Sequence, residues 1–426
     1  MYFMPKTGIL FLLLTIFLIY GSSSFAYNAD QERIKKLKAS AINGNSESCL
    51  ALGNAYYYGS GIPKDYYSAF RWYFESADKG NPTAQFNLAL CYDQGIGVEQ
   101  NKIEALRWYN KAAENGVIQA KYNLAIYYKE GHNFVSNAGT VILNSDMPKA
   151  IKLLQECSTV SFAPANRELA KIYLNEKKSL KDQELGMKYL ILASQGNDPE
   201  ALYMIAKIKM ENGTPVKEVF SYIKVAADNN VVDSFEYVGV CYETGLGEIK
   251  QDKELAIKYY TKAAYNNVIS AQVRLGEYYL NGTIVQMNIW ESIYWFQKAA
   301  DQNDPYALFM LGSFAEQGLG EKADKKKALK YYMKSAKLGF PKAQFNLAMY
   351  YAGNNDSNDN DSSMAYLWLR KAALQDDTKA QKELGFYCIM GEGTKQNYGN
   401  GLNWLSLSRD KGDSEAAEFL DNIQIK

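Results

Sequence analysis

Residues 84–116 read AQFNLALCYDQGIGVEQNKIEALRWYNKAAENG, and this stretch decides the fold. Apolar residues recur at helical spacing in its first half. In its second half Trp108 and Ala112 are four residues apart, which places them on one helical face. Gly95-Ile96-Gly97 lies between the halves and suits a turn, because glycine adopts positive φ values without steric cost. The stretch therefore predicts two helices joined by a glycine turn.

The same pattern recurs about every 36 residues along the chain. Each repeat opens with a small residue, here called the anchor, followed by an aliphatic residue at the fourth position after it and Gly or Ala at the fifth. The ten anchors are Ser48, Ala84, Ala120, Ala165, Ala201, Ser234, Ala271, Ala307, Ala343 and Ala380. A two-helix unit cannot bury its apolar face alone, so such units must stack. We predict an all-α fold: an α/α superhelical solenoid of about ten helix-turn-helix repeats, each with a helix A and a helix B.

Helix B has its own repeated pattern. Its centre is aromatic in nine of the ten repeats, and Ala or Ser follows four residues later. The central residues are Trp72, Trp108, Leu154, Tyr189, Tyr222, Tyr259, Trp295, Tyr331, Trp368 and Trp404. In the third repeat this alignment pairs Leu154 with Ser158. We expect the small positions to let helix A approach helix B closely, while the large residues fill the seam between neighbouring repeats.

The predicted repeats fill nearly all of the chain. We assign 27–44 to an N-terminal helix, 45–412 to the ten repeats, and 413–426 to a C-terminal capping helix. The repeats are irregular in 117–230, where an insertion from Gly131 to Met147 replaces the glycine turn of the third repeat.

Residues 1–26 resemble a targeting segment. Lys6 precedes an apolar run of 12 residues, Ile9–Tyr20, and small residues lead to Ala26. The run is short for a bilayer core of about 30 Å, and the arrangement is typical of a cleaved signal peptide. We predict export to the periplasm or the medium; an uncleaved membrane anchor is the alternative.

Composition excludes several functions. Lys and Arg total 47, as do Asp and Glu, so the net charge is zero and nucleic-acid binding is not expected. A single histidine cannot build a multi-histidine metal site. We predict no cofactor, no metal, no membrane span in the mature chain, and a monomer.

The repeats resemble the Sel-one-like repeat family, which is related to tetratricopeptide repeats. The resemblance rests on Ala84–Ala89, Gly95–Val98 and Ala105–Gly116, recurs throughout, and covers about 45–420. It implies a scaffold for protein–protein interaction. For exported bacterial members it also implies host contact, envelope assembly or exopolysaccharide machinery.

Some members of that family have been described as β-lactamase-like, so serine motifs matter. Ser-x-x-Lys occurs at Ser76 and Ser221, but Ser-Asp-Asn is missing and the only Lys-Thr-Gly lies at 6–8. We predict no catalytic residues. The loop at 356–361 has the alternating Asp356, Asn358 and Asn360 of a calcium loop but lacks its Gly and Glu, so we interpret it as a solvated loop.

The five cysteines are odd in number and irregular in spacing. We interpret them as small buried hydrophobic residues. A disulfide between Cys49 and Cys91 is the alternative.

A partner would bind along helix A on the concave face, by analogy with tetratricopeptide repeats. The candidate residues are Phe86, Leu90, Tyr122, Ile126, Tyr203, Phe309 and Phe345. Rings, amides and few charges suit a protein or an extended peptide; packing between repeats is the competing role for the rings. We therefore predict a non-enzymatic exported scaffold. The alternatives are an envelope glycan- or exopolysaccharide-handling protein and a β-lactamase-like hydrolase.

Overall fold

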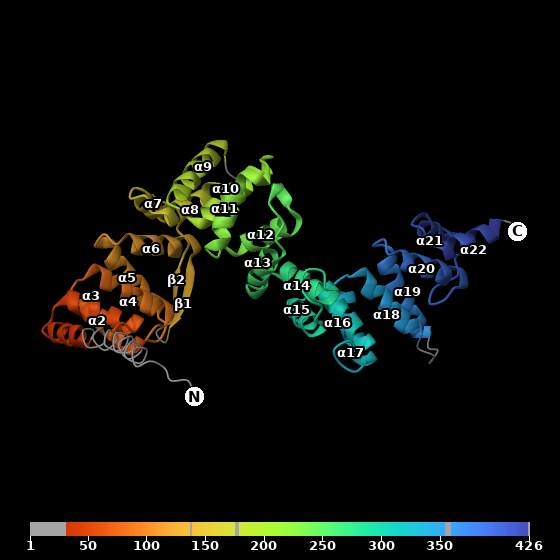
Figure 1. The fold of residues 1–426 in the computed structure, drawn as a ribbon, viewed down its shortest axis with the longest axis horizontal. Helices are drawn as coiled ribbons and strands as arrows, with labels where there is room; N and C mark the ends of the chain where they lie inside the picture. Colours follow the sequence, from red (N-terminus) through yellow and green to blue (C-terminus); the bar gives the residue numbers. More distant parts are fainter. Residues whose placement is uncertain (1–30, 137–138, 175–178, 354–358, 425–426) are drawn as a thin grey trace, which may run out of the picture. The chain divides into compact units, whose positions relative to one another are not determined.

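The computed structural model describes residues 31–136, 139–174, 179–353 and 359–424. The predicted signal peptide at 1–26 and residues 356–358 of the predicted loop lie outside these residues. Residues 359–361 begin helix α19, so the prediction of a loop was wrong for them. The chain divides into two units, 1–205 and 206–426, with the division inside helix α10 (Figure 1).

The first unit holds helix pairs and one hairpin. Its elements are a helical segment at 31–42, α2 (Ser46–Tyr58), α3 (Tyr66–Asp78), α4 (Pro82–Gln94), α5 (Lys102–Glu114), α6 (Ile118–Glu130), β1 (His132–Ser136), β2 (Gly139–Leu143), α7 (Met147–Ser158), α8 (Ala163–Tyr173), α9 (Leu180–Gln195) and the first part of α10 (Pro199–Glu211).

The second unit continues the pattern. Its elements are the rest of α10, α11 (Val216–Asp228), α12 (Val232–Thr244), the short 3-10 turn η1 (Leu246–Glu248), α13 (Lys253–Tyr265), α14 (Ile269–Asn281), α15 (Ile289–Asp301), α16 (Pro305–Gln317), α17 (Lys325–Lys337), α18 (Pro341–Ala352), α19 (Asp359–Ala373), α20 (Thr378–Met390), α21 (Tyr398–Asp410) and α22 (Ser414–Gln424). Even-numbered helices from α2 to α20 are helices A, and odd-numbered helices from α3 to α21 are helices B. The predicted α/α solenoid is confirmed.

Local sequence signals set the helix ends. The Asn81 side chain accepts a hydrogen bond from the Ala84 N–H at 3.0 Å, and Pro82 occupies the first turn of α4. The helix ends at Gly95, whose φ of 73° is left-handed. Helix α5 then begins after Asn101, which caps the Glu104 N–H at 3.1 Å.

Close packing of helix A on helix B explains the small residue at the fifth position. A Cβ added to Gly53 would lie 2.7 Å from the ring of Tyr73, and one on Gly312 would lie 2.7 Å from Tyr332. Both rings are buried. The prediction that small residues allow this approach is confirmed, because any larger side chain would push the two helices apart.

The third repeat corrects our alignment by one residue. Leu154 and Cys157 are fully buried, whereas Ser158 is only half-buried. Cys157 stands eight residues before the next anchor, as Ala112 does in the second repeat. Leu154 therefore corresponds to Tyr109, the residue after the central tryptophan, and the pairing of Leu154 with Ser158 was wrong.

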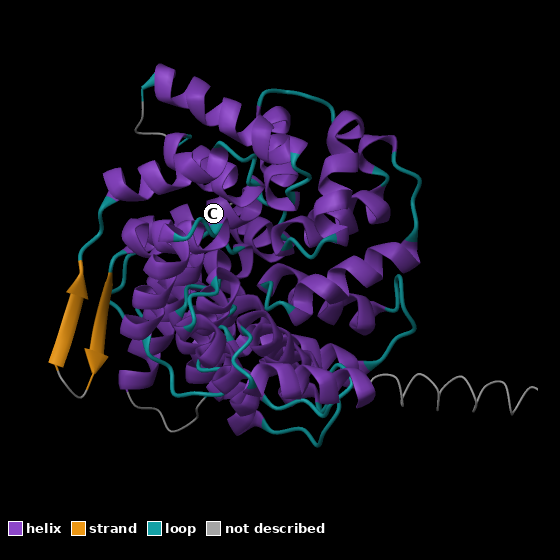
Figure 2. Cartoon of the chain, turned by 90° about the vertical axis from the view of Figure 1, so that its left-hand side faces the viewer, coloured by secondary structure: helices purple, strands orange, loops and turns teal. Residues whose placement is uncertain are grey.

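The insertion of the third repeat forms a β-hairpin, which the sequence analysis did not predict (Figure 2). Strands β1 and β2 pair antiparallel, with His132 opposite Leu143 and Ser136 opposite Gly139. The Asp146 N–H bonds the carbonyl of Tyr128 at 2.7 Å, as the Asn101 N–H bonds that of Tyr92 at 2.8 Å in the second repeat. The hairpin therefore extends a turn whose closing hydrogen bond is unchanged.

Candidate functional site: the helix-A face

The seven residues predicted to bind a partner are all half-buried, and none is exposed. Phe86 and Leu90 pack against one core cluster, and Phe309 and Phe345 pack against another in the second unit. All seven lie on helices A, and Tyr122 packs against a further cluster in the first unit. We call the surface formed by helices A the helix-A face.

The predicted rings also pack within and between repeats. Phe86 lies 6.0 Å from the ring of Tyr109 in its own repeat, and Tyr122 meets Phe162, just before the next helix A, edge-on at 5.6 Å. Phe309 lies 5.2 Å from Phe340. The competing packing role is therefore real for these rings, and only their remaining exposed edges are open to a partner.

Acid–tyrosine clusters are a feature that the sequence analysis missed. Asp93 accepts hydrogen bonds from the hydroxyls of Tyr109, at 3.1 Å, and of Tyr127 on the next helix A. Lys102 pairs with the same carboxylate at 2.6 Å. The carboxylate therefore joins helix B of its own repeat to helix A of the next.

The cluster recurs at equivalent positions in the second unit. Glu243 accepts from Tyr260 at 2.6 Å and from Tyr278, and Arg274 lies 3.0 Å away. Glu316 accepts from Tyr332 at 2.7 Å. Each acid stands nine residues after its anchor. This shared position is the sequence signal from which the acid–tyrosine clusters could have been predicted.

These tyrosines remain donors at neutral pH. Burial, followed by the negative charge of Asp93, raises the pKa of Tyr109 above its ordinary value. Burial and the hydrogen bond to Glu243 raise the pKa of Tyr278 to about 12. A protonated hydroxyl can donate to a half-buried carboxylate, so each tyrosine keeps its hydrogen bond to the acid at neutral pH.

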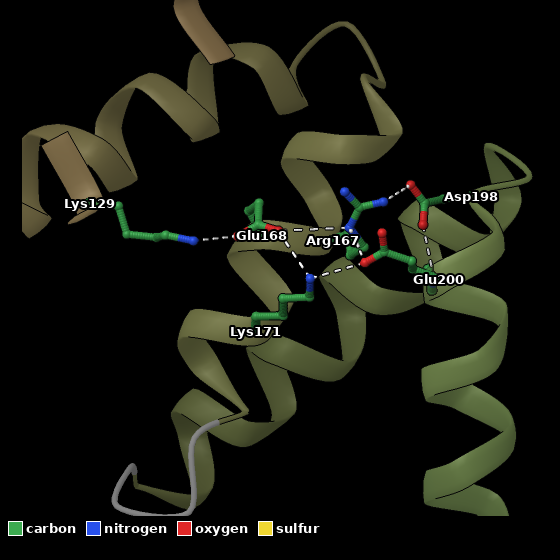
Figure 3. A network of polar contacts seen from close by, with 7 residues as sticks. Lys129, Arg167, Glu168, Lys171, Asp198 and Glu200 are labelled. Atoms are coloured by element: carbon green, nitrogen blue, oxygen red, sulfur yellow. Dashed lines mark hydrogen bonds and ion pairs between the residues drawn. The ribbon is translucent and has the colours of Figure 1, made fainter. Parts of the chain in front are cut away.

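An ionic network replaces the rings in the fourth repeat (Figure 3). Arg167 and Lys171 on α8 occupy the second and sixth positions after the anchor, where the second repeat carries Phe86 and Leu90. The network contains Lys129, Arg167, Glu168, Lys171, Asp198 and Glu200. It spans three successive helices A: α6, α8 and α10.

Glu168 and Arg167 are the centre of this network. Glu168 pairs with Lys129 at 2.7 Å and with Lys171 at 3.2 Å. Arg167 pairs with Asp198, the residue before α10, at 2.7 Å. Burial alone would raise the pKa of Glu168, but the two ammonium groups outweigh it, and the net pKa is lowered. The network therefore keeps a buried carboxylate ionised on the helix-A face.

The second unit has a pocket beside the acid–tyrosine cluster of Glu316 and Tyr332. A hollow of 290 Å³ is lined by residues that include Glu316, Tyr332, Asn346 and Tyr350. This volume is at the lower limit for ligand pockets, about 300 Å³. It suits one side chain of a partner better than a whole metabolite.

The serine motif has a structural role. Ser76 is fully buried, and its hydroxyl donates to the carbonyl of Ser46 at 2.7 Å. Ser335 donates to Pro305 in the same way at 2.6 Å. Within the described residues no three His, Cys, Asp or Glu side chains form a metal-binding group.

The five cysteines are free and buried. Their interpretation as small hydrophobic residues is confirmed, and the alternative bridge between Cys49 and Cys91 is not formed. Burial raises the pKa of Cys91 to about 12, so its thiol is unreactive at neutral pH.

Comparison with known proteins identifies the class. The Sel1 repeat pattern matches 46–81, 82–117, 118–156, 163–198, 236–268, 269–304, 305–340, 341–377 and 378–413. The chain belongs to the Sel1 repeat family. The pair α10–α11 lies between the fourth and fifth of these matches.

Individual relatives share parts of the chain. Chitin synthase regulatory factor 3 of Schizosaccharomyces pombe is 30% identical over 214 residues, which cover 47% of this chain and 22% of the relative. Chitin synthase regulator SKT5 of Saccharomyces cerevisiae is 26% identical over 220 residues, 48% of this chain and 31% of the relative. The chain thus spans less than a third of the length of these two regulators.

A solved structure supports the fold. The protective antigen c5321 of uropathogenic Escherichia coli matches with a TM-score of 0.69 at 23% identity, covering 90% of this chain and 80% of that one. Among the residues described here, no helix is both long and apolar enough to cross a membrane.

Proposed function

We propose that this protein is an exported, non-enzymatic scaffold that binds another protein, or an extended peptide from one, along the concave helix-A face. The observation that carries the proposal is the change of side chains along this face within one unit. Half-buried rings at Phe86 and Tyr122 are followed by Arg167 at the same position of the next helix A, and Arg167 and the nearby Lys171 both form ion pairs. Membership of a repeat family whose solenoids act as scaffolds supports it.

The network offers a partner charges of both signs. Lys171 and Glu200 keep side-chain exposures of 42% and 46%, although they pair with each other at 3.1 Å. Arg167 and Glu168 beneath them are mostly buried. A partner with both acidic and basic side chains can form ion pairs with Lys171 and Glu200 while Arg167 and Glu168 stay in place. Such pairing gives specificity, and little conformational entropy is lost because the buried residues are already ordered.

Export is part of the proposal and rests on Ile9–Tyr20 and the small residues up to Ala26. The absence of catalysis rests on the sequence, which has no Ser-Asp-Asn to accompany its Ser-x-x-Lys motifs.

Affinity capture from the native cells tests the proposal. We expect wild type to retain a partner that Lys171→Glu loses, because the reversed charge repels Glu200 and any acidic group of the partner. Lys152→Glu is the matched control, since Lys152 is an exposed lysine on α7, a helix B. A capture profile unchanged by Lys171→Glu, in a variant that is folded by circular dichroism, would remove this face from the account.

A second candidate is a role in envelope polysaccharide synthesis, favoured by the relatives named as chitin synthase regulators. Under this reading the partner is a component of a polysaccharide synthase, or the glycan itself. A synthase subunit or a sugar in the captured material supports it. Capture of unrelated proteins together with no retention on glycan arrays contradicts it.

A further inference from the structure

Helix α17 carries a row of lysines, most of which have no ion pair among the described residues. Its sequence, KKKALKYYMKSAK, has six lysines and no acidic residue, in a chain whose net charge is zero. Lys330, Lys334 and Lys337 are exposed, and within the described chain none of them has an ion pair. Together with Lys327, which pairs with Glu321, they follow an i, i+3, i+7, i+10 spacing, which lines one helical face over about 15 Å.

This arrangement opposes helix stability. Like charges four residues apart, such as Lys330 and Lys334, destabilise a helix by a few tenths of a kcal/mol per pair. Lys325, Lys326 and Lys327 in the first turn oppose the helix dipole, whereas Lys334 and Lys337 in the last turn interact favourably with it. A negatively charged binding partner would turn this repulsion into attraction.

Apolar side chains flank the lysine row on the neighbouring helices B. Trp290, on α15, is 65% exposed, and Leu374, just after α19, is also 65% exposed. Tyr294 and Leu367 occupy the position of Lys330 in their own repeats and are exposed as well. The surface therefore alternates apolar, basic and apolar across three successive helices.

The three helices are joined by direct contacts. The Tyr331 hydroxyl of α17 donates to the Gln297 side chain of α15 at 3.1 Å. Met333 of α17 packs into the core cluster that holds Trp368 of α19. A hollow of 480 Å³ lies along the lysine row, lined by Lys327, Lys330, Tyr331, Met333, Lys334 and Lys337.

We propose that the outer face of α15, α17 and α19 is a peripheral binding site for an anionic lipid bilayer. The lysines lie over the phosphate groups, one of which fits the hollow beside Tyr331. Trp290 and Leu374 enter the interface between headgroups and acyl chains, where tryptophan is favoured.

The exposed apolar side chains beside the lysines favour a bilayer over a soluble polyanion. A soluble acidic polymer would pair with the lysines but would leave the flanking Trp290 and Leu374 in water. A bilayer provides negative charge and an apolar layer at the depths that this surface requires. Lys298 and Lys371 occupy the position of Lys334 in the adjacent repeats and extend the charge on both sides.

Vesicle binding tests the site. The protein is produced without residues 1–26, whose apolar run would bind lipid by itself. Wild type should bind phosphatidylcholine vesicles containing about one third phosphatidylglycerol, but not pure phosphatidylcholine, and the binding should weaken as salt is raised. Each lysine near such a surface contributes about 1 kcal/mol, or about fivefold, so Lys330→Gln, Lys334→Gln and Lys337→Gln together should weaken binding about 100-fold.

A matched variant controls for net charge. Lys152→Gln, Lys181→Gln and Lys188→Gln remove three exposed lysines from α7 and α9 and should leave vesicle binding unchanged. Equal losses in the two triple variants would overturn the site.

A fluorescence readout distinguishes lipid from other polyanions. Brominated acyl chains should quench wild-type tryptophan emission, and the quenching should disappear in Trp290→Phe. Binding to soluble polyglutamate without binding to vesicles, or vesicle binding without quenching, would overturn the bilayer proposal.

Discussion

Two regions of the first unit join their repeats on the same helix-pair backbone but with different interactions. One is the seam between α4 and α6, and the other is the seam between α6, α8 and α10. At the first seam, tyrosine hydroxyls bridge the repeats through Asp93. At the second, Arg167 and Glu168 bridge them through ion pairs. The difference shows that this backbone needs only the small anchor, the aliphatic residue and the Gly or Ala at the fifth position. The remaining helix-A positions are free to vary from repeat to repeat.

The largest effect should come from breaking the charged seam. Arg167→Ala leaves Asp198, which is almost fully buried, without its guanidinium partner. Removing one member of a buried ion pair costs about 3–5 kcal/mol. We expect a loss of this size in the free energy of unfolding, measured by urea denaturation. Arg107→Ala is the control: its guanidinium is 63% exposed and pairs with Glu104 at 3.6 Å, so a loss below about 1 kcal/mol is expected.

A smaller effect should follow at the tyrosine seam. Tyr109→Phe removes one hydrogen bond to a charged acceptor, and such bonds contribute about 1.5–3 kcal/mol. Because Tyr127 and Lys102 still hold Asp93, we expect a loss near the lower value. The same urea experiment measures it, and a loss as large as that of Arg167→Ala would contradict the distinction between the two seams.

Acid should weaken the charged seam. The pKa of Glu168 is lowered in the folded protein, so its contribution is present above the unfolded value, about 4.3, and is lost as the pH falls through the folded value. We expect the free energy of unfolding to fall less between pH 6 and 3, approximately, in Glu168→Gln than in wild type. Parallel pH profiles for the two proteins would show that Glu168 makes no such contribution.

Alkali should weaken the tyrosine seam instead. The pKa values of Tyr109 and Tyr127 are raised by burial and by Asp93, so their contribution is complete below the unfolded value, about 10, and is lost as the pH rises through the folded values. Replacing both by Phe should flatten the decline of stability above about pH 10. The readout is again denaturation against pH, and an unchanged slope argues against this assignment.

The smallest effect is expected at Lys102. Its side chain is 37% exposed, and its pair with Asp93 is near the surface. Lys102→Gln should cost below about 1 kcal/mol and should lose its effect in high salt. A larger cost would mean that the lysine, rather than the tyrosines, holds Asp93.

The repeat fold was predictable because its signals are local. Each of these signals lies within one repeat of about 36 residues: the anchor, the fourth and fifth positions after it, and the turn glycines. The structure confirms the helix pairs that they predict. The third repeat misled the alignment because its helix B has no aromatic residue and carries two adjacent leucines, Leu153 and Leu154. The distance of eight residues from Cys157 to the next anchor would have corrected it. The hairpin was missed because its short strands follow no repeat pattern.

The candidate site was harder to predict, since its interactions join distant residues. Asp93 and Tyr127 are 34 residues apart, and Arg167 and Asp198 are 31 apart. Helix-A positions could be named from the period, but their burial depends on the next repeat. Phe86 and Tyr122 were therefore correctly placed on helices A, while their packing against Tyr109 and Phe162 appeared only in the structure.

Site-specific photocrosslinking in the native cells tests the central claim most directly. A photoreactive phenylalanine at Asn87, half-buried on α4 beside Phe86, should crosslink to a partner protein. The same group at Lys152, exposed on helix B of the third repeat, should not form that adduct. An adduct at Lys152 and none at Asn87 would place partner binding away from the helix-A face and contradict the account.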